Sequence, residues 1–190
     1  MSNQSNFKLE KWLRELDRIE ADVVYLKFNN TEFLQLAKQF NDNALEPFLW
    51  DFAKRNYVSY MSMSIRRISG KYRDGVSLYK LLEDIKDNAE SITSSLFLQE
   101  WSGGKEESLF LEFFGTDKFL KESVINNHME VLDKTTKLVR DRADQFEAHI
   151  DMKPKIESLP TFNNVDNCVE VITEIYKKLY YLLNQSSLSI

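Results

Sequence analysis

The scarcity of glycine and proline is the feature that most constrains what this chain can fold into. Its 190 residues contain five Gly and three Pro, whereas the two residues together average about 12% of a protein chain. Sandwiches and doubly wound sheets reverse direction often, and their tight turns need these residues. The hydrophobic fraction of 43% is sufficient for a core. We therefore predict an all-α protein with a single domain over residues 1–190.

Charge and cysteine content narrow the classes of function. Thirty acidic and 25 basic residues leave a formal net charge of −5. No overall basic field therefore drives binding to nucleic acid, but the net charge does not exclude a local basic patch. The single cysteine, Cys168, excludes an intramolecular disulfide and a cysteine-based zinc site within one chain. We expect no metal and no cofactor. The N-terminal residues lack an apolar signal core, and no apolar run reaches about 18 residues, so we expect a cytoplasmic protein without a membrane span.

Apolar residues recur at spacings of three and four, which predicts helices with one apolar face each. The predicted core faces include Trp12, Leu16, Ile19, Val23 and Leu26 of the first helix and Val169, Ile172, Tyr176, Leu179 and Leu183 of the last. Cys168 and the aromatic residues Phe48, Trp50, Phe52, Tyr57 and Tyr60 are also interpreted as core. The predicted helices are Phe7–Phe28, with an interruption at Asn29 and Asn30 and a short continuation to Phe40; Leu45–Ile68; a short helix capped by Ser77; Asp117–Ile150; and Val165–Asn184. Residues 92–116 are interpreted as an irregular insertion that contains either a helical turn or a short strand, and residues 185–190 as a frayed tail. About five helices with short connections predict an up-and-down bundle.

The helix predicted over Asp117–Ile150 carries two parallel stripes. The first is an apolar, heptad-like seam formed by Ile125, Met129, Leu132, Thr136, Val139, Ala143, Phe146 and Ile150. The second runs beside it with the same spacing and is formed by His128, Val131, Thr135, Leu138, Arg142, Gln145 and His149. A stripe at the border of the core is where a partner helix or a ligand meets a bundle. In an uninterrupted helix, Arg142, Gln145 and His149 share one face.

An arginine and a histidine on one face suit the cleavage of a phosphodiester. A histidine with a pKa near neutrality moves a proton, and a guanidinium fits an anionic phosphate. RNA supplies its own nucleophile, the 2′-hydroxyl, so this chemistry requires no metal. A single histidine does not readily act as both base and acid. A homodimer solves this difficulty by bringing two copies of the pair together across a two-fold axis.

Two segments of the chain resemble a known family. Residues 140–151 read RDRADQFEAHID, which resembles the signature of HEPN domains, an arginine followed by four to six residues and then a histidine on a long helix. The AHID ending, together with SIRRISGKYRDGVSLYKLLEDI at residues 64–85, resembles the abortive-infection, AbiU-type branch. The resemblance implies an obligate dimer, a metal-independent endoribonuclease whose active site lies at the dimer interface, and a role as a toxin or phage-defence effector. It also makes an antitoxin protein a candidate partner.

The resemblance assigns roles to individual residues. Arg142 and His149 are the predicted catalytic pair, with six residues between them. The family often has a polar residue directly after the arginine, where this chain has Ala143, so the polar role passes to Gln145 or Asp144, with Asp141 a lesser candidate. Arg140 is followed by the acidic Asp141 but lies nine positions from His149, on the opposite helical face. Members paired with a nucleotidyltransferase antitoxin tend to have Tyr where this chain has Asp151, which argues against that type of antitoxin.

Other interpretations of these residues stay open. A basic cluster formed by Arg66, Arg67, Lys71 and Arg73 is a candidate for contact with the RNA backbone, but bases are also favoured at the end of any helix. His149 can equally serve as a cation at a helix C-terminus, and His128 as a plain polar residue of the stripe. Because some HEPN-like proteins are inactive binding modules, the alternative function is a non-catalytic helical protein that uses the same helix face for dimerisation or partner binding.

Overall fold

The computed structural model describes residues 3–43, 46–72, 75–94, 106–147 and 159–184. These residues form six α-helices: α1 (Asn3–Asn43), α2 (Pro47–Ser69), α3 (Leu78–Lys86), α5 (Glu106–Phe113), α6 (Glu122–Arg142) and α7 (Phe162–Asn184). A 3₁₀ turn spans Ala89–Ser91, and a π-helical turn, Ala143–Glu147, follows α6 directly. Within these ranges the only β-type pairing is an isolated bridge between Thr93 and Phe119. The all-α prediction is confirmed.

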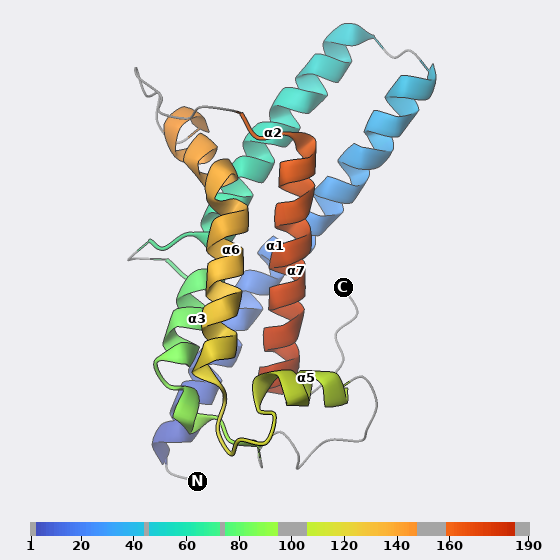
Figure 1. Cartoon of the computed structure of the whole chain (residues 1–190). Coiled ribbons are helices and arrows are strands. Elements are labelled where there is room, and N and C mark those ends of the chain that lie inside the picture. Colours follow the sequence, from blue (N-terminus) through green and yellow to red (C-terminus); the bar gives the residue numbers. More distant parts are fainter. Residues whose placement is uncertain (1–2, 44–45, 73–74, 95–105, 148–158, 185–190) are drawn as a thin grey trace.

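The helices pack as an up-and-down bundle (Figure 1). α6 and α7 lie side by side and run in opposite directions, α1 passes behind them, and α3 lies beside α6. α5 crosses the lower end of the bundle. α1 and α2 form a long antiparallel hairpin whose tip extends beyond the other helices, while the C-terminal part of α2 packs on α6.

The core consists of apolar helix faces, and on α1 and α7 these are the faces that the sequence pattern predicts. On α1 the side chains predicted to share one face are all buried, namely Trp12, Leu16, Ile19, Val23 and Leu26. The predicted face of α7 is also buried. The indole Nε1 of the buried Trp12 donates to the Asp84 carboxylate of α3 at 2.8 Å, which satisfies the one polar atom of this side chain. The amphipathic pattern therefore locates the core correctly on α1 and α7. On α2 it is wrong in part, because Tyr57 is buried but Phe48, Phe52 and Tyr60, also predicted to be core, are exposed.

The predicted interruption of the first helix at Asn29 and Asn30 is wrong, because α1 continues without a break to Asn43. Asn30 is buried, its Nδ2 donates to Asp166 of α7 at 2.7 Å, and its Oδ1 accepts from the Tyr57 hydroxyl of α2 at 2.5 Å. Asn29 donates to the Tyr25 carbonyl of its own helix. The asparagines interrupt the apolar pattern, yet their amides find partners without leaving the helix.

The starts of α2 and α3 agree with the sequence, whereas α7 begins at Phe162, before the predicted Val165, and α6 begins later than predicted. α2 begins at Pro47, and the Ser77 hydroxyl caps α3 by accepting from the Lys80 N–H at 3.2 Å. The helix predicted from Asp117 begins only at Glu122. The segment before it is extended, because the Leu120 N–H donates to the Ile92 carbonyl at 3.0 Å. α5 lies inside the predicted irregular insertion, and the predicted frayed tail at 185–190 lies outside the described residues.

Among the helices that the structure describes, none combines the length and the apolar character needed to cross a membrane. The longest of them, α1, carries charged side chains along its exposed surface.

The two neighbouring asparagines provide a matched stability test. Substitution Asn30→Ala leaves the buried Tyr57 hydroxyl without its acceptor, so we expect it to lower the free energy of unfolding by about 1–3 kcal/mol. Asn29→Ala removes only a hydrogen bond within the helix, and we expect a change within about 0.5 kcal/mol. Urea denaturation followed by circular dichroism measures both values, and equal effects would contradict the role assigned to Asn30.

Candidate functional site

The region that carries the predicted arginine–histidine motif leaves regular α-helical geometry in its middle. α6 ends at Arg142, and the next five residues form the π-helical turn Ala143–Glu147. Such a turn bonds i to i+5, so it falls out of step with the α-helical period of about 3.6 residues. The prediction of one uninterrupted helix through this region is therefore wrong. The apolar seam is buried from Ile125 to Ala143, whereas Phe146, predicted to continue it, is 39% exposed.

Arg142 lies at the junction between α6 and the π-helical turn. Its side chain is half-buried, and its guanidinium carbon lies 5.6 Å from the centroid of the Phe146 ring. The π-helical turn thus turns Phe146 out of the core and places it against the predicted phosphate-binding cation. His149 lies outside the described residues, so its pairing with Arg142 stays a prediction.

Ala143 shows why this chain departs from the family pattern directly after the arginine. Its side chain is fully buried, and it continues the seam after Thr136 and Val139 on the side of α6 that faces the core. A polar side chain there would lose its hydration without gaining a partner, which costs free energy. A small apolar residue is therefore what the packing at this position favours.

The supporting acids predicted around Arg142 are both occupied by ion pairs. Asp144, in the π-helical turn, accepts a hydrogen bond from Arg66 Nε of α2, and its Oδ1 also accepts from the Tyr72 hydroxyl at 3.1 Å. The Arg66 guanidinium also lies 4.3 Å from the Tyr72 ring centroid. Burial and the Asp144 charge raise the pKa of Tyr72, which keeps it a neutral donor. Asp144 therefore ties the π-helical turn to the end of α2.

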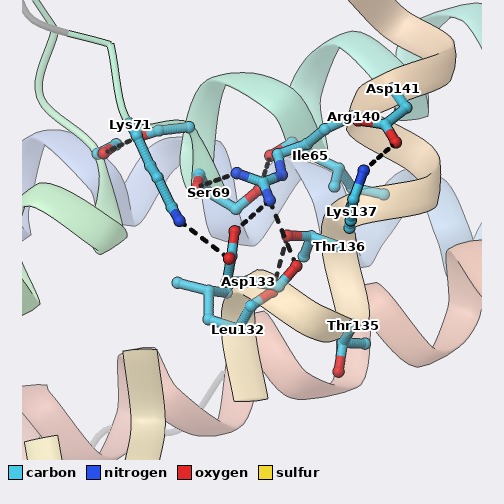
Figure 2. A network of polar contacts seen from close by, with 12 residues as sticks. Ile65, Ser69, Lys71, Leu132, Asp133, Thr135, Thr136, Lys137, Arg140 and Asp141 are labelled. Atoms are coloured by element: carbon cyan, nitrogen blue, oxygen red, sulfur yellow. Dashed lines mark hydrogen bonds and ion pairs between the residues drawn. The ribbon is translucent and has the colours of Figure 1, made fainter. Parts of the chain in front are cut away.

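Asp141, the lesser candidate, pairs within its own helix. Its carboxylate binds Lys137 one turn earlier on α6 (Figure 2). Gln145 is half-buried in the π-helical turn. Of the two predicted acids, Asp144 contacts another helix and Asp141 does not do so through this ion pair.

Arg140 belongs to a separate network on the side of α6 that faces α2 (Figure 2). It donates to the Asp133 carboxylate and to the Ser69 carbonyl, the latter at 3.4 Å, and Lys71 Nζ lies 2.9 Å from Asp133 Oδ2. Burial raises the pKa of Asp133, but the hydrogen bonds from Lys71 and Arg140 outweigh it and bring the pKa below its usual range. The two arginines of the RDR segment thus occupy different environments. Arg140 belongs to the contacts with Asp133 and Ser69 that hold α6 on the end of α2, called the clamp below. Arg142 lies beside the partly exposed Phe146 ring.

The predicted basic cluster is brought together at the end of α2 but is matched by acids. Arg66 pairs with Asp144, Arg67 Nη2 lies 2.7 Å from Asp22 Oδ1 of α1, and Lys71 pairs with Asp133. Arg73 lies outside the described residues. The contact of this cluster with RNA stays a prediction, and any phosphate bound there competes with these carboxylates.

His128, the first residue of the predicted border stripe, lies inside the bundle. Its side chain is buried, and Nε2 approaches Glu112 of α5 at 3.3 Å without hydrogen-bond geometry. Lys178 Nζ of α7 lies 2.9 Å from the same carboxylate. Burial and the neighbouring lysine lower the pKa of His128, outweighing the opposing effect of Glu112 and Glu174. The stripe therefore reaches the surface only from Val131 onward.

The single cysteine lies in the core of the bundle. Cys168 is fully buried on α7, where burial raises its thiol pKa to about 12, in keeping with the core position predicted for it. Within the described ranges, no group of three or more His, Cys, Asp or Glu side chains is arranged to hold a metal ion.

Sequence reasoning missed two members of these networks, Tyr72 and Asp133. Both act across long separations, 72 positions between Tyr72 and Asp144 and 62 between Lys71 and Asp133. The local pattern carries no signal for such pairs, because helical periodicity reports which face of a helix is apolar and not which polar side chains meet.

An all-α bundle with Arg142 at the end of α6 agrees with the class of HEPN-like proteins. The family model of the AbiU2 HEPN proteins matches residues 6–190. The chain therefore belongs to this abortive-infection HEPN family, as the RDRADQFEAHID segment predicts. Comparison with curated proteins and with solved structures finds no match in either.

The clamp between α6 and α2 predicts an asymmetry between two cations of α6. Arg140 is mostly buried and binds both an acid and a backbone carbonyl, so we expect Arg140→Ala to lower the free energy of unfolding by about 1–3 kcal/mol. Lys137 is 67% exposed in its pair with Asp141, and we expect Lys137→Ala to change stability by about 0–1 kcal/mol. Urea denaturation of the two variants compares them, and a larger loss for Lys137→Ala would contradict the clamp.

His128 predicts a pH dependence of stability with a definite sign. Because its pKa in the folded protein is below that of the unfolded chain, the unfolded chain binds the proton more readily. The associated stability is present above the unfolded pKa of about 6.5 and is lost as the pH falls below it. We expect the free energy of unfolding to fall more between pH 8 and pH 5 in the wild type than in His128→Gln. Parallel curves for the two proteins would show that His128 does not titrate on unfolding.

Proposed function

We propose that this protein is a metal-independent endoribonuclease that acts as a phage-defence effector and cleaves RNA at a composite site between two copies of the chain. The observation that carries the proposal is the position of Arg142, half-buried at the start of a π-helical turn, within a chain that matches the abortive-infection HEPN family over residues 6–190. Turns of this kind occur often at functional sites.

The proposed chemistry uses the RNA 2′-hydroxyl as the nucleophile. His149 removes the 2′-hydroxyl proton while the oxygen attacks the adjacent phosphorus, and the 5′-oxygen leaves after a proton from the partner subunit's His149 reaches it. The products are a 2′,3′-cyclic phosphate and a 5′-hydroxyl. Arg142 stabilises the additional negative charge on the phosphoryl oxygens in the transition state. One guanidinium and one imidazole from each copy account for the whole reaction without a metal.

The surroundings of Arg142 support this role. The Phe146 ring lies beside the Arg142 guanidinium, and the next residue, Ala143, is buried in the core. In the proposed dimer, the second copy meets Arg142 at this border of the core. Asp144 holds the π-helical turn on α2, so the backbone that carries Arg142 has a fixed support. Catalysis of this type requires cations that are positioned before the substrate binds.

The nuclease proposal is tested with purified protein and a fluorescent single-stranded RNA in EDTA. We expect the wild type to cleave, and both Arg142→Ala and His149→Ala to lose at least about 100-fold in rate, since a general acid–base group contributes about 10²–10⁴. Arg55→Ala, an exposed arginine of α2 outside this region, serves as the control. Absence of cleavage by the wild type, or equal cleavage by all variants, would leave the non-catalytic binding protein as the better interpretation.

The composite site is tested by co-refolding the wild type with increasing amounts of His149→Ala. Because the proposed reaction takes its base and its acid from the His149 residues of two copies, a mixed dimer lacks one of them. We therefore expect activity to fall with the square of the wild-type fraction, and a fall in direct proportion would contradict the composite site. A dimeric mass from light scattering supports the interface. A monomeric mass at all concentrations would contradict it.

A further inference from the structure

An open cleft of about 350 Å³ lies where α2 ends and the chain turns toward α3. Its lining includes two tyrosines, two arginines and two apolar side chains, namely Tyr60, Met63, Arg66, Arg67, Tyr72 and Val76. Tyr60 and Tyr72 are each 42% exposed. The cleft therefore presents aromatic rings and guanidinium groups together to solvent.

This combination matches the chemistry of a single nucleotide. Bases of single-stranded nucleic acid stack on aromatic side chains, and nearby cations hold the phosphate. An arginine has five N–H donors, and the described ion pairs of Arg66 and Arg67 use one nitrogen each. The volume of the cleft fits one base and its sugar. In a base-paired duplex the bases stay stacked inside the helix, so they are not available to enter the cleft.

We propose that this cleft is a subsite for one nucleotide of single-stranded RNA, with the base against Tyr60 and Tyr72 and the phosphate on Arg67. That this nucleotide flanks the scissile bond rests on the proposed nuclease function. The link to the catalytic motif is Asp144, which contacts Arg66 and Tyr72 of the cleft and lies two residues after Arg142. A strand seated in the cleft therefore continues toward the π-helical turn.

The acids beside the cleft act as competitors of the phosphate. Asp22 occupies Arg67 in an ion pair in which the Arg67 side chain is 61% exposed. Exposed pairs of this kind contribute little to stability, so a phosphate can replace the carboxylate. The proposal then has an unusual consequence, because neutralising Asp22 removes a competing anion and strengthens RNA binding.

The first arm of the test measures binding without cleavage. A fluorescent single-stranded RNA with 2′-O-methyl groups lacks the nucleophile, and its affinity is measured by anisotropy in EDTA. We expect Tyr60→Leu to weaken binding roughly 5- to 100-fold, the range that loss of one stacked base produces, and Tyr60→Phe to bind like the wild type. The matched control is Tyr25→Leu, an exposed tyrosine of α1 outside the cleft, which should bind like the wild type.

The second arm tests the phosphate contact. We expect Arg67→Ala to reduce the slope of log affinity against log salt by about 0.7, the value for one phosphate of a single strand. Arg55→Ala removes the same charge from an exposed position about three turns away on α2 and should leave the slope unchanged. Asp22→Asn should bind more tightly than the wild type, a result that damage to the fold does not produce. Thermal unfolding confirms that each variant is folded.

The outcomes separate this proposal from the nuclease proposal. If the wild type cleaves RNA while Tyr60→Leu and Arg67→Ala bind like the wild type, the cleft is not a subsite and the nuclease proposal stands. If binding depends on the cleft but no RNA is cleaved, the subsite stands and the cleavage chemistry is wrong. Failure of the wild type to bind the 2′-O-methyl RNA overturns the subsite whatever the cleavage assay shows.

Discussion

Burial of the apolar seam of α6 is the constraint on which the rest of this structure depends. From Ile125 to Ala143 the seam is enclosed by α2, α3 and α7, and its side chains have almost no contact with solvent. Because burying apolar surface is the main favourable term in folding, the rotation of α6 about its axis is decided by this seam. The seam therefore also determines which side of α6 each polar residue faces relative to the core.

Residues that flank the seam form ion pairs and hydrogen bonds with neighbouring helices. Arg140 and Asp133 hold α6 on the end of α2, and Asp144 does the same for the π-helical turn through Arg66 and Tyr72. These contacts are charged hydrogen bonds at the edge of the core, where they are shielded only in part from water. Their effect is to hold the backbone around Arg142 in place. Arg66 and Tyr72, the partners of Asp144, also line the cleft at the end of α2.

The fold followed from periodicity, and the details of the site did not. The faces of α1 and α7, Pro47 at the start of α2 and the Ser77 cap were predictable because each depends on residues within one or two turns. The sequence pattern places the start of α6 too early, because it does not show that the Leu120 N–H donates to the distant Ile92 carbonyl. The continuity of α1 through Asn30 was missed for a similar reason, since its partners, Tyr57 and Asp166, belong to other helices.

The sequence by itself determined an all-α bundle, the apolar faces of α1 and α7 and the seam of α6 up to Ala143, the AbiU-type resemblance, and Arg142 as the candidate cation at the border of the core. These properties are local, because they depend on spacing along one helix or on a short motif. Only the tertiary structure decided that His128 is buried, that the helix changes to a π-helical turn after Arg142, and that Asp144 meets Arg66 and Tyr72. These features depend on which helices become neighbours, and hydrophobic periodicity does not specify the partners of polar side chains.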